Sequence, residues 1–267
     1  MTGLAGQERS PIKARRTPLR ERLARHAPFA LSLAAGLALW EIAGRLTSAA
    51  FMAPLSETLL RFWQLARSGE LLRLTLSSAS LFATGLGLAI VVGMPLGLLL
   101  ARVRLLREAL DVYIMILYAT PMVALIPFIL SLFGFGFGPK VLVVFLFAVF
   151  PILYNTIEGA RSIKPELIEV ARSYRSGEWA LWREVMVPYT LPYTMTGIRQ
   201  AIGRALVGMI AAEFWLSATG LGGLIMNATQ NFDTGAVFAA VLVMVAAALI
   251  LMRLGMTLEG RFARWRG

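Results

Sequence analysis

Two ionisable residues, Arg204 and Glu213, stand nine residues apart inside an otherwise apolar stretch of the chain. A charge in the hydrocarbon of a membrane is expensive, so each side chain should face a cavity, a partner helix or a polar neighbour. A buried arginine can attract an anion, and a buried carboxylate can control access to it. The pair therefore predicts either a path for a charged solute, or a structural ion pair or dimer contact.

The depth of the two residues separates their expected roles. If their helix begins near Thr196, Arg204 lies about 12 Å along it and Glu213 about 26 Å, at roughly 1.5 Å per residue. An anion arriving from the outer side would meet Glu213 first, which is unfavourable unless the carboxylate is neutralised. We therefore expect Glu213 to be paired, or bonded to backbone groups of residues 217–223, and to act in an outer gate. Arg204 is the better candidate for drawing an anion inward.

The chain offers no set of residues for catalysis. It has no cysteine and a single histidine, His26, so the common zinc sites and histidine-based catalysis are hard to build. No GxxxxGK[ST] motif occurs, so ATP cannot bind here through a P-loop. We expect no metal, no cofactor and no enzymatic activity in this chain.

Composition places the chain in a membrane. Of its 267 residues, 58% are hydrophobic and only 15% charged, against roughly 25% charged in a soluble domain. The mean hydropathy is +0.70, which is typical of a protein that crosses the bilayer several times. The net charge of +11 resides in loops between apolar stretches, so it does not indicate a nucleic-acid partner.

Six apolar stretches are each about long enough to cross a bilayer as a helix. We expect an all-α membrane domain over 28–260, preceded by a basic arm (1–27) and followed by a short tail (261–267). Apolar residues at helical spacing in 53–73 predict an interfacial helix, whereas the small residues of 217–227 predict a loop. Four glycines of the second span should let helices approach closely: Gly85, Gly87, Gly93 and Gly97. The six spans are 28–46, 76–101, 110–133, 141–157, 196–216 and 237–254.

Lysine and arginine are distributed unequally between the two sides of these spans. With the N-terminal arm inside, the inner segments hold seven in the arm, three in 102–107, five in 161–183 and four from residue 253 onward. The outer segments hold five, and the last outer loop, 217–235, has none. By the positive-inside rule, both termini and the stretch 161–192 should lie in the cytoplasm.

The stretch 161–192 is too polar to lie in hydrocarbon, and it reads as two short helices. Pro165 suits a first helical turn, and apolar residues then follow at helical spacing up to Tyr174. Ser176 and Gly177 break the pattern, with Ser176 as a possible cap for the second helix. The second apolar stripe runs from Trp179 to Met186, and two prolines should close it: Pro188 and Pro192.

This stretch resembles the EAA loop of the permeases of binding-protein-dependent ABC importers. That pattern reads Glu-Ala-Ala, three residues, Gly, nine residues, Ile-x-Leu-Pro; the chain has Glu-Val-Ala at 169–171 and Val-Met-Val-Pro at 185–188. Arg175 stands at the glycine position, and Gly177 could have taken over the turn. The resemblance implies a coupling loop that docks on an ATPase subunit, through Glu169, Val170, Ala171, Tyr174, Arg175, Gly177, Trp179, Trp182 and Pro188.

The resemblance extends over about 54–255 and is nearest to the sulfonate, taurine and nitrate branch of that family. It rests on short motifs in order, such as Leu-Ile-Pro at 125–127, Phe-Pro-Ile at 150–152 and Ala-Thr-Gly-Leu-Gly at 218–222. It implies a type I ABC importer permease in the bacterial inner membrane, with six transmembrane helices. The implied partners are two ATPase subunits that bind ATP and Mg²⁺, a second permease copy and an extracytoplasmic solute-binding protein.

Three alternatives remain open from the sequence. The stretch 161–192 could lie on the membrane as an amphipathic anchor, since tryptophans and arginines suit an interface. The chain could be an ATP-independent secondary transporter or channel, although it has no clear internal repeat. The resemblance suggests a small anion as the solute, but riboflavin and pyrimidine precursors belong to similar systems.

Overall fold

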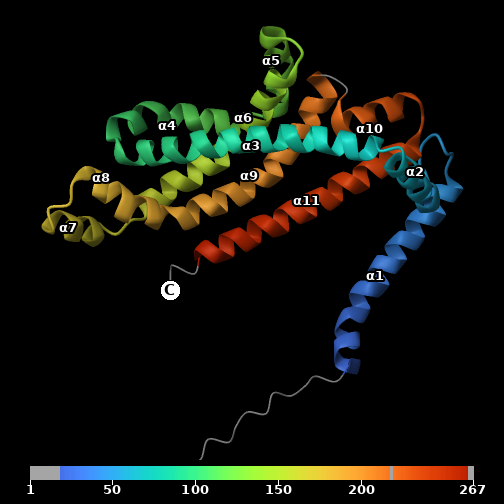
Figure 1. The fold of residues 1–267 in the computed structure, drawn as a ribbon, viewed down its shortest axis with the longest axis horizontal. Helices are drawn as coiled ribbons and strands as arrows, with labels where there is room; N and C mark the ends of the chain where they lie inside the picture. The colour runs from blue at the N-terminus through green and yellow to red at the C-terminus, as the bar shows by residue number, and fades with distance from the viewer. Residues whose placement is uncertain (1–18, 217–218, 264–267) are drawn as a thin grey trace, which may run out of the picture.

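The computed structural model describes residues 19–216 and 219–263, and within these ranges every regular element is a helix. Figure 1 shows the helices as an elongated bundle with one helix leading away from it. In chain order the elements are α1 (Leu19–Leu46), α2 (Leu55–Arg67), α3 (Glu70–Arg102), α4 (Arg104–Ala119), the 3-10 helix η1 (Met122–Leu125), α5 (Ile126–Phe133), α6 (Phe137–Arg161), α7 (Pro165–Ser173), α8 (Glu178–Leu181), the π-helix η2 (Trp182–Met186), α9 (Val187–Leu216), α10 (Gly220–Gln230) and α11 (Thr234–Ala263).

The centre of the molecule is formed by α3, α6 and α9, which pack along much of their lengths (Figure 1). Their shared core includes Leu81 and Phe82 of α3, Ile152 of α6, and Ala201 and Met209 of α9, all buried. Because lipid tails are as apolar as these side chains, close van der Waals packing holds such helices together in a membrane.

Small residues set the spacing between α3 and α6. A Cβ added at Gly85 would lie 2.5 Å from Val144, and one added at Gly97 would lie 2.8 Å from Thr156. Neither distance is sterically possible, so these positions require glycine unless the helices move apart. The predicted close packing is confirmed for Gly85, Gly93 and Gly97 and is wrong for Gly87, beside which the space is open.

Among the described residues, four helices are long and apolar enough to cross a membrane unaided. They are Ala27–Leu46 within α1, all of α3, all of α6, and Thr234–Thr257 within α11. Two bent pairs also qualify: Leu105–Ala119 with Met122–Phe133, and Glu178–Leu216 with Gly220–Gln230. Counting each pair as one span gives six, the number that the sequence predicted.

The helices differ from the predicted ranges in several details. The predicted span 110–133, which contains Pro121, is broken at that residue, since the chain turns by 94° after Thr120 and Pro121 cannot continue the helix. The range 217–227 is not a loop, since it contains most of α10. The first candidate span, Ala27–Leu46, agrees with the predicted range 28–46, although α1 itself begins at Leu19, within the predicted arm. The last helix also runs on to Ala263, into the predicted tail.

The two prolines expected to close the stretch 161–192, from here on called the coupling stretch, lie inside a helix. Pro188 is the second residue of α9 and Pro192 lies in its second turn. Directly before them, η2 has the wider π geometry, and the N–H of Val187 bonds back to the carbonyl of Trp182. This shift in the hydrogen-bond register comes directly before Pro188, which lies in the first turn of α9 and lacks only a donor there, so the helix continues instead of ending.

The first helix, α1, makes almost no contact with the rest of its own chain. Only 6% of its apolar window is buried, and Figure 1 shows it leading away from the bundle. It is fastened at its end near α2, where Trp40 Nε1 donates to the carbonyl of Ala53 at 3.1 Å. There Glu41 also pairs with Arg45, one helical turn further along α1.

Candidate functional site

The coupling stretch forms two short helices at one end of the molecule (Figure 1), as the sequence predicted. Pro165 opens α7, and Glu166 lies in its first turn, where a negative charge suits the helix dipole. The residue before α8 is Gly177, and no side chain caps that helix. The predicted capping role of Ser176 is therefore wrong.

Arg175 occupies the turn between α7 and α8 in a left-handed conformation, with φ of 53°. Its N–H bonds to the carbonyl of Arg172 at 2.8 Å, and the N–H of Ser176 bonds to that of Ala171 at 3.1 Å. This is the Schellman pattern that closes many helices, and its left-handed position usually holds glycine. Gly177 has φ of −65°, so the idea that it took over the turn is wrong.

Four large apolar side chains of this stretch are exposed: Leu167, Val170, Tyr174 and Trp179, here named the loop patch. Tyr174 is 83% exposed and Trp179 is 78% exposed. Other apolar residues of the stretch face inward, since Leu181 and Met186 are buried and Trp182 is half-buried. Ala171 is half-buried and Glu169 and Pro188 are exposed. The second predicted stripe is thus split between the surface and the interior.

The coupling stretch is fixed to the membrane helices on two sides. Arg102, the last residue of α3, donates from Nη2 to both oxygens of Glu178 at 2.9 Å. The hydroxyl of Tyr189 in α9 donates to the carbonyl of Ser162 at 3.0 Å. The sequence did not predict this pair, because helical periodicity indicates contacts only between residues a few positions apart, and Arg102 and Glu178 are 76 positions apart. The loop patch therefore has a defined position relative to α3 and α9.

Arg204 lies exposed in the middle third of α9, beside an aromatic pair. Its guanidinium carbon lies 4.7 Å from the centre of the Tyr118 ring, and its Nη2 donates to the Tyr118 hydroxyl at 3.0 Å. The Tyr118 ring stacks with that of Tyr154, with centroids 6.1 Å apart. A cation over an aromatic face is stabilised by the ring quadrupole. No pattern in the sequence pointed to Tyr118 or Tyr154.

A shallow hollow of about 320 Å³ adjoins Arg204; we name it the Arg204 hollow. Its walls come from η1, α6, α9 and the residue that follows α4. Most wall side chains are apolar, and the guanidinium is the charged group among them. The lining residues are Thr120, Met122, Phe147, Gly203, Arg204 and Val207.

Glu213 is buried and fully engaged by neighbouring donors. The hydroxyl of Ser78 donates to Oε1 at 2.6 Å, and the N–H of Gly222 donates to Oε2 at 2.8 Å. Ser78 in turn accepts the N–H of Leu221 at 2.9 Å. The carboxylate thus lies at the N-terminus of α10, where backbone N–H groups favour a negative charge. The prediction that Glu213 bonds to backbone groups of residues 217–223 is confirmed.

A buried lysine completes this cluster, which we name the Glu213 cage: Ser78, Lys140, Glu213, Thr219 and the N–H groups of Leu221 and Gly222. Lys140 is 5% exposed and donates from Nζ to the hydroxyl of Thr219 at 2.5 Å. It also attracts the Glu213 carboxylate electrostatically. The cage joins α3, α6, α9 and α10 at the end of the molecule opposite the coupling stretch.

Arg204 and Glu213 do not pair with each other. Nine residues at about 100° each turn the helix through roughly two and a half turns, so the two side chains lie on opposite faces. Glu213 faces the α3 side and Arg204 faces Tyr118 of α4. The ion pair between these two that the sequence left open is therefore excluded.

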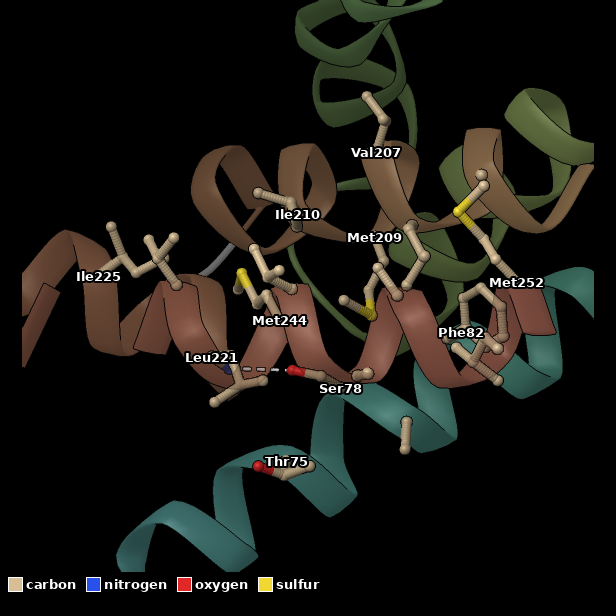
Figure 2. A pocket seen from close by; sticks show the side chains of 18 of the residues that line it. Thr75, Ser78, Phe82, Val207, Met209, Ile210, Leu221, Ile225, Met244 and Met252 are labelled. Carbon is tan, nitrogen blue, oxygen red and sulfur yellow. Dashed lines mark hydrogen bonds between the residues drawn. The ribbon is translucent and has the colours of Figure 1, made fainter. Parts of the chain in front are cut away.

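Two further cavities flank the Glu213 cage. A groove of about 810 Å³ lies between α3, α9, α10 and α11. Figure 2 shows the Ser78–Leu221 bond beside it and methionines such as Met209 and Met244 in its wall. Its lining is almost wholly apolar, so it has no group that would bind a charged solute. A second hollow of about 330 Å³ is polar, with Glu70, Arg73 and Asn227 in its lining.

No group of three or more potential metal ligands occurs among the residues that the structure describes. The arrangement therefore presents three connected features: an exposed apolar patch at one end, an arginine on an aromatic ring midway, and a hydrogen-bonded carboxylate at the other end. One helix, α9, carries or adjoins all three.

Comparison with known proteins gives consistent matches. The family model described as "binding-protein-dependent transport system inner membrane component" matches residues 93–264. The riboflavin transport system permease protein RibX of Chloroflexus aurantiacus is 36% identical over 205 residues, which cover 77% of this chain and 76% of RibX. The Escherichia coli protein SsuC, named for aliphatic sulfonates transport, is 32% identical over 93% of this chain and 95% of SsuC. The bicarbonate transport system permease protein CmpB of Synechococcus elongatus is 33% identical over 72% of this chain and 66% of CmpB.

Proposed function

This chain belongs to the family of binding-protein-dependent transport system inner membrane components, and we propose that it is the permease subunit of an ATP-driven importer. As a member it is a multi-pass membrane protein of an ABC transport system for small solutes. The proposal adds the direction of transport, its dependence on ATP and the class of solute. ATP and Mg²⁺ would bind to separate ATPase subunits, because this chain has no P-loop. We propose two such subunits per assembly.

The observation that carries the proposal is the loop patch. Exposed large apolar side chains grouped at one place commonly mark a protein–protein contact. Here the patch lies at the tip of the molecule, and the Arg102–Glu178 bridge fixes its position. We propose that the loop patch docks on an ATPase subunit, with Glu169 and Ala171 near the contact.

The membrane-anchor alternative fits the loop less well. An interfacial anchor helix carries mostly Lys and Arg on its polar face, which attract anionic lipids. Across α7, the turn that follows it and α8, the acidic residues Glu166, Glu169 and Glu178 occur together with the basic residues Arg172 and Arg175. A mixed surface of this kind suits a protein partner with complementary charges.

The helix α9 provides the connection from this docking site to the solute. It follows η2 directly and continues past Arg204 to Glu213. A movement of the coupling stretch, driven by ATP binding in the partner, would therefore reach the Glu213 cage. We propose alternating access in which the cage acts in the outer gate, while Arg204 faces the solute.

The proposed orientation follows from the charge distribution. The coupling stretch and both termini would lie in the cytoplasm, and the polar hollow near Glu70 and Asn227 would face outward. A solute-binding protein would then deliver its ligand at the α10 end. A second permease copy would cover exposed apolar faces such as those of α4 and α5, which makes a homodimer the simplest assembly.

We further propose that the solute is a small anion. Two of the three relatives above are named for sulfonates and bicarbonate, and Arg204 has no carboxylate partner among the described residues. The relative named for riboflavin transport shows that the family also includes proteins named for other kinds of solute.

The proposal is tested by reconstituting the permease with its cognate ATPase and solute-binding protein in liposomes. Uptake should require ATP and the binding protein, and an affinity tag at Gly267 should be accessible only from the cytoplasmic side. Uptake that ignores ATP and follows an ion gradient would establish a secondary transporter instead. A tag accessible from the outer surface would contradict the six-span arrangement.

A further inference from the structure

We propose that the Arg204 hollow is a binding site for the solute within the membrane, and that it selects an organic oxyanion with an apolar body. Tyr118 acts in this site as the residue that positions the guanidinium. The inference rests on the proposed transport function, but it adds a residence site for the solute and a chemical class. Three independent features of the described residues lead to it.

The first feature is an unpaired charge at mid-depth. Arg204 lies about 26 Å along α9 from Val187 and about 18 Å from Leu216, at roughly 1.5 Å per residue. Arg199, five residues earlier, pairs with Glu259 at 2.7 Å, whereas Arg204 has no acidic partner within the described chain. A charge at this depth is costly in lipid even with an aromatic neighbour, so the face that carries Arg204 should line a path that admits water or an anion.

The second feature is the fixed geometry of the guanidinium. A guanidinium has five N–H donors in a planar fork that matches a carboxylate or sulfonate. One donates to the Tyr118 hydroxyl, and the others have no acceptor among the described side chains and backbone. Tyr118 stacks on Tyr154, so the ring under the guanidinium is itself held in place. A pre-oriented fork loses less entropy when it binds an oxyanion.

The third feature is the character of the walls. Met122, Phe147 and Val207 surround the charged group with apolar surface. Ligand sites of this kind hold the body of a molecule by apolar contact and fix its orientation by a few polar groups. A bare inorganic ion would be dehydrated against these walls without compensation, whereas an alkyl or aryl group would be favourably buried.

The experiment measures binding directly, without ATP or partner proteins. The full-length permease is purified in lipid nanodiscs, and radiolabelled butanesulfonate is the probe in equilibrium dialysis. Sulfate and 1-butanol serve as competitors that present the charge alone and the apolar body alone. We expect saturable butanesulfonate binding, and we expect each competitor to need at least roughly tenfold higher concentration than unlabelled butanesulfonate.

Variants then separate a binding role from a structural one. Arg204→Ala should weaken binding by about tenfold to a hundredfold, and Arg204→Lys should recover part of the loss. Tyr118→Phe keeps the ring but removes the acceptor, so its loss should be smaller than that of Tyr118→Leu. Arg253→Ala and Tyr113→Phe, exposed residues outside the hollow, are the matched controls and should leave binding unchanged.

The outcomes decide the inference independently of ATP coupling. It is overturned if butanesulfonate does not saturate, if Arg204→Ala binds as well as the unchanged protein, or if both Arg204 variants lose the folded state in size-exclusion chromatography. Sulfate competing equally would remove the apolar-body selectivity, and equal binding by both Tyr118 variants would remove the positioning role. Failure of ATP-dependent uptake with intact butanesulfonate binding would instead contradict the proposed importer.

Discussion

Ser78 and Glu213, 135 residues apart, are joined by a buried hydrogen bond of 2.6 Å that links α3 to the end of α9. Ser78 also accepts the N–H of Leu221, and Glu213 also accepts that of Gly222. The bond therefore belongs to a closed network in which the carboxylate has a donor on each oxygen. This arrangement explains how a glutamate can be buried near the end of an apolar helix.

The cage predicts graded effects of substitution at Glu213. Glu213→Gln replaces one acceptor oxygen by an amide donor, so one of the two donors loses its acceptor, at a cost of about 1–3 kcal/mol. Glu213→Ala leaves both donors without an acceptor and removes the charge that attracts the Lys140 ammonium, so it should cost more. We expect Glu213→Gln to assemble and to transport with mild impairment, while thermal unfolding in detergent ranks the variants. Equal melting temperatures for Glu213→Ala and the unchanged chain would refute the role of the cage.

The left-handed turn at Arg175 predicts that glycine there is stabilising. A non-glycine residue in this conformation costs about 1–2 kcal/mol, so Arg175→Gly should protect the end of α7. Gly177→Val should have little effect, because Gly177 is extended and has open space around it. Hydrogen exchange at the Ser176 amide measures both variants. Greater damage from Gly177→Val than from Arg175→Gly would contradict the observed turn.

The two neighbouring glycines of α3 form a matched pair. A Cβ at Gly85 collides with Val144, whereas one at Gly87 meets nothing within 4 Å. Gly85→Ala should therefore separate α3 from α6 and lower the melting temperature, while Gly87→Ala should be neutral, or stabilising by up to about 1 kcal/mol through helix propensity. The same loss in both variants would show that helix packing does not depend on this contact.

The loop patch predicts a loss of ATPase association without a loss of folding. Trp179→Ala and Tyr174→Ala remove exposed apolar contacts, and Ala171→Asp places a charge beside them. Each should weaken copurification of the ATPase by roughly tenfold. Phe135→Ala removes an equally exposed ring that lies outside the coupling stretch and serves as the control. Unchanged association and uptake in all three patch variants would argue against docking.

The bridge between Arg61 and Asp233 predicts an acid-sensitive fastening of α2 to α11. Burial alone would raise the pKa of the Asp233 carboxyl, but hydrogen bonds from Arg61 and from the N–H of Ala236 outweigh it and hold the pKa below its ordinary value. Since the folded pKa is the lower one, this stabilisation is present above about pH 4 and is lost as the pH falls further.

Hydrogen exchange in α2 at pH 3 and pH 7 tests this dependence. Asp233→Asn should keep the cap on Ala236 but abolish the change between the two pH values. The same change in that variant would assign the effect to another carboxyl group.

The sequence predicted the general plan because helical spans and charge bias are local signals. It also predicted the backbone bonds of Glu213, since an unpaired carboxylate in a membrane needs donors nearby. It could not select Ser78, which is one of several serines in the same span and is identified only by the distance across to α9. The sequence did not predict α10, because its glycines are typical of a loop. The carboxylate that accepts a bond from the first turn of α10 belongs to another helix, so it leaves no local signal.

Turn geometry was the other source of error. The suggestion that Gly177 takes over the turn is wrong, because two backbone hydrogen bonds hold Arg175 in the left-handed conformation. The prediction that Pro188 and Pro192 close the second helix is also wrong, because both lie inside α9, directly after a π turn. Both errors arise where a local preference is overridden by bonds to neighbouring residues.

Because α9 is continuous, a rotation at one end of the molecule would displace the other end. With 30 residues the helix is about 45 Å long, at roughly 1.5 Å per residue. A tilt of about 5° around the coupling end would displace the far end by about 4 Å, more than a hydrogen bond can stretch. Small rotations at the ATPase contact would therefore suffice either to break the Ser78–Glu213 bond or to carry α3 along with α9.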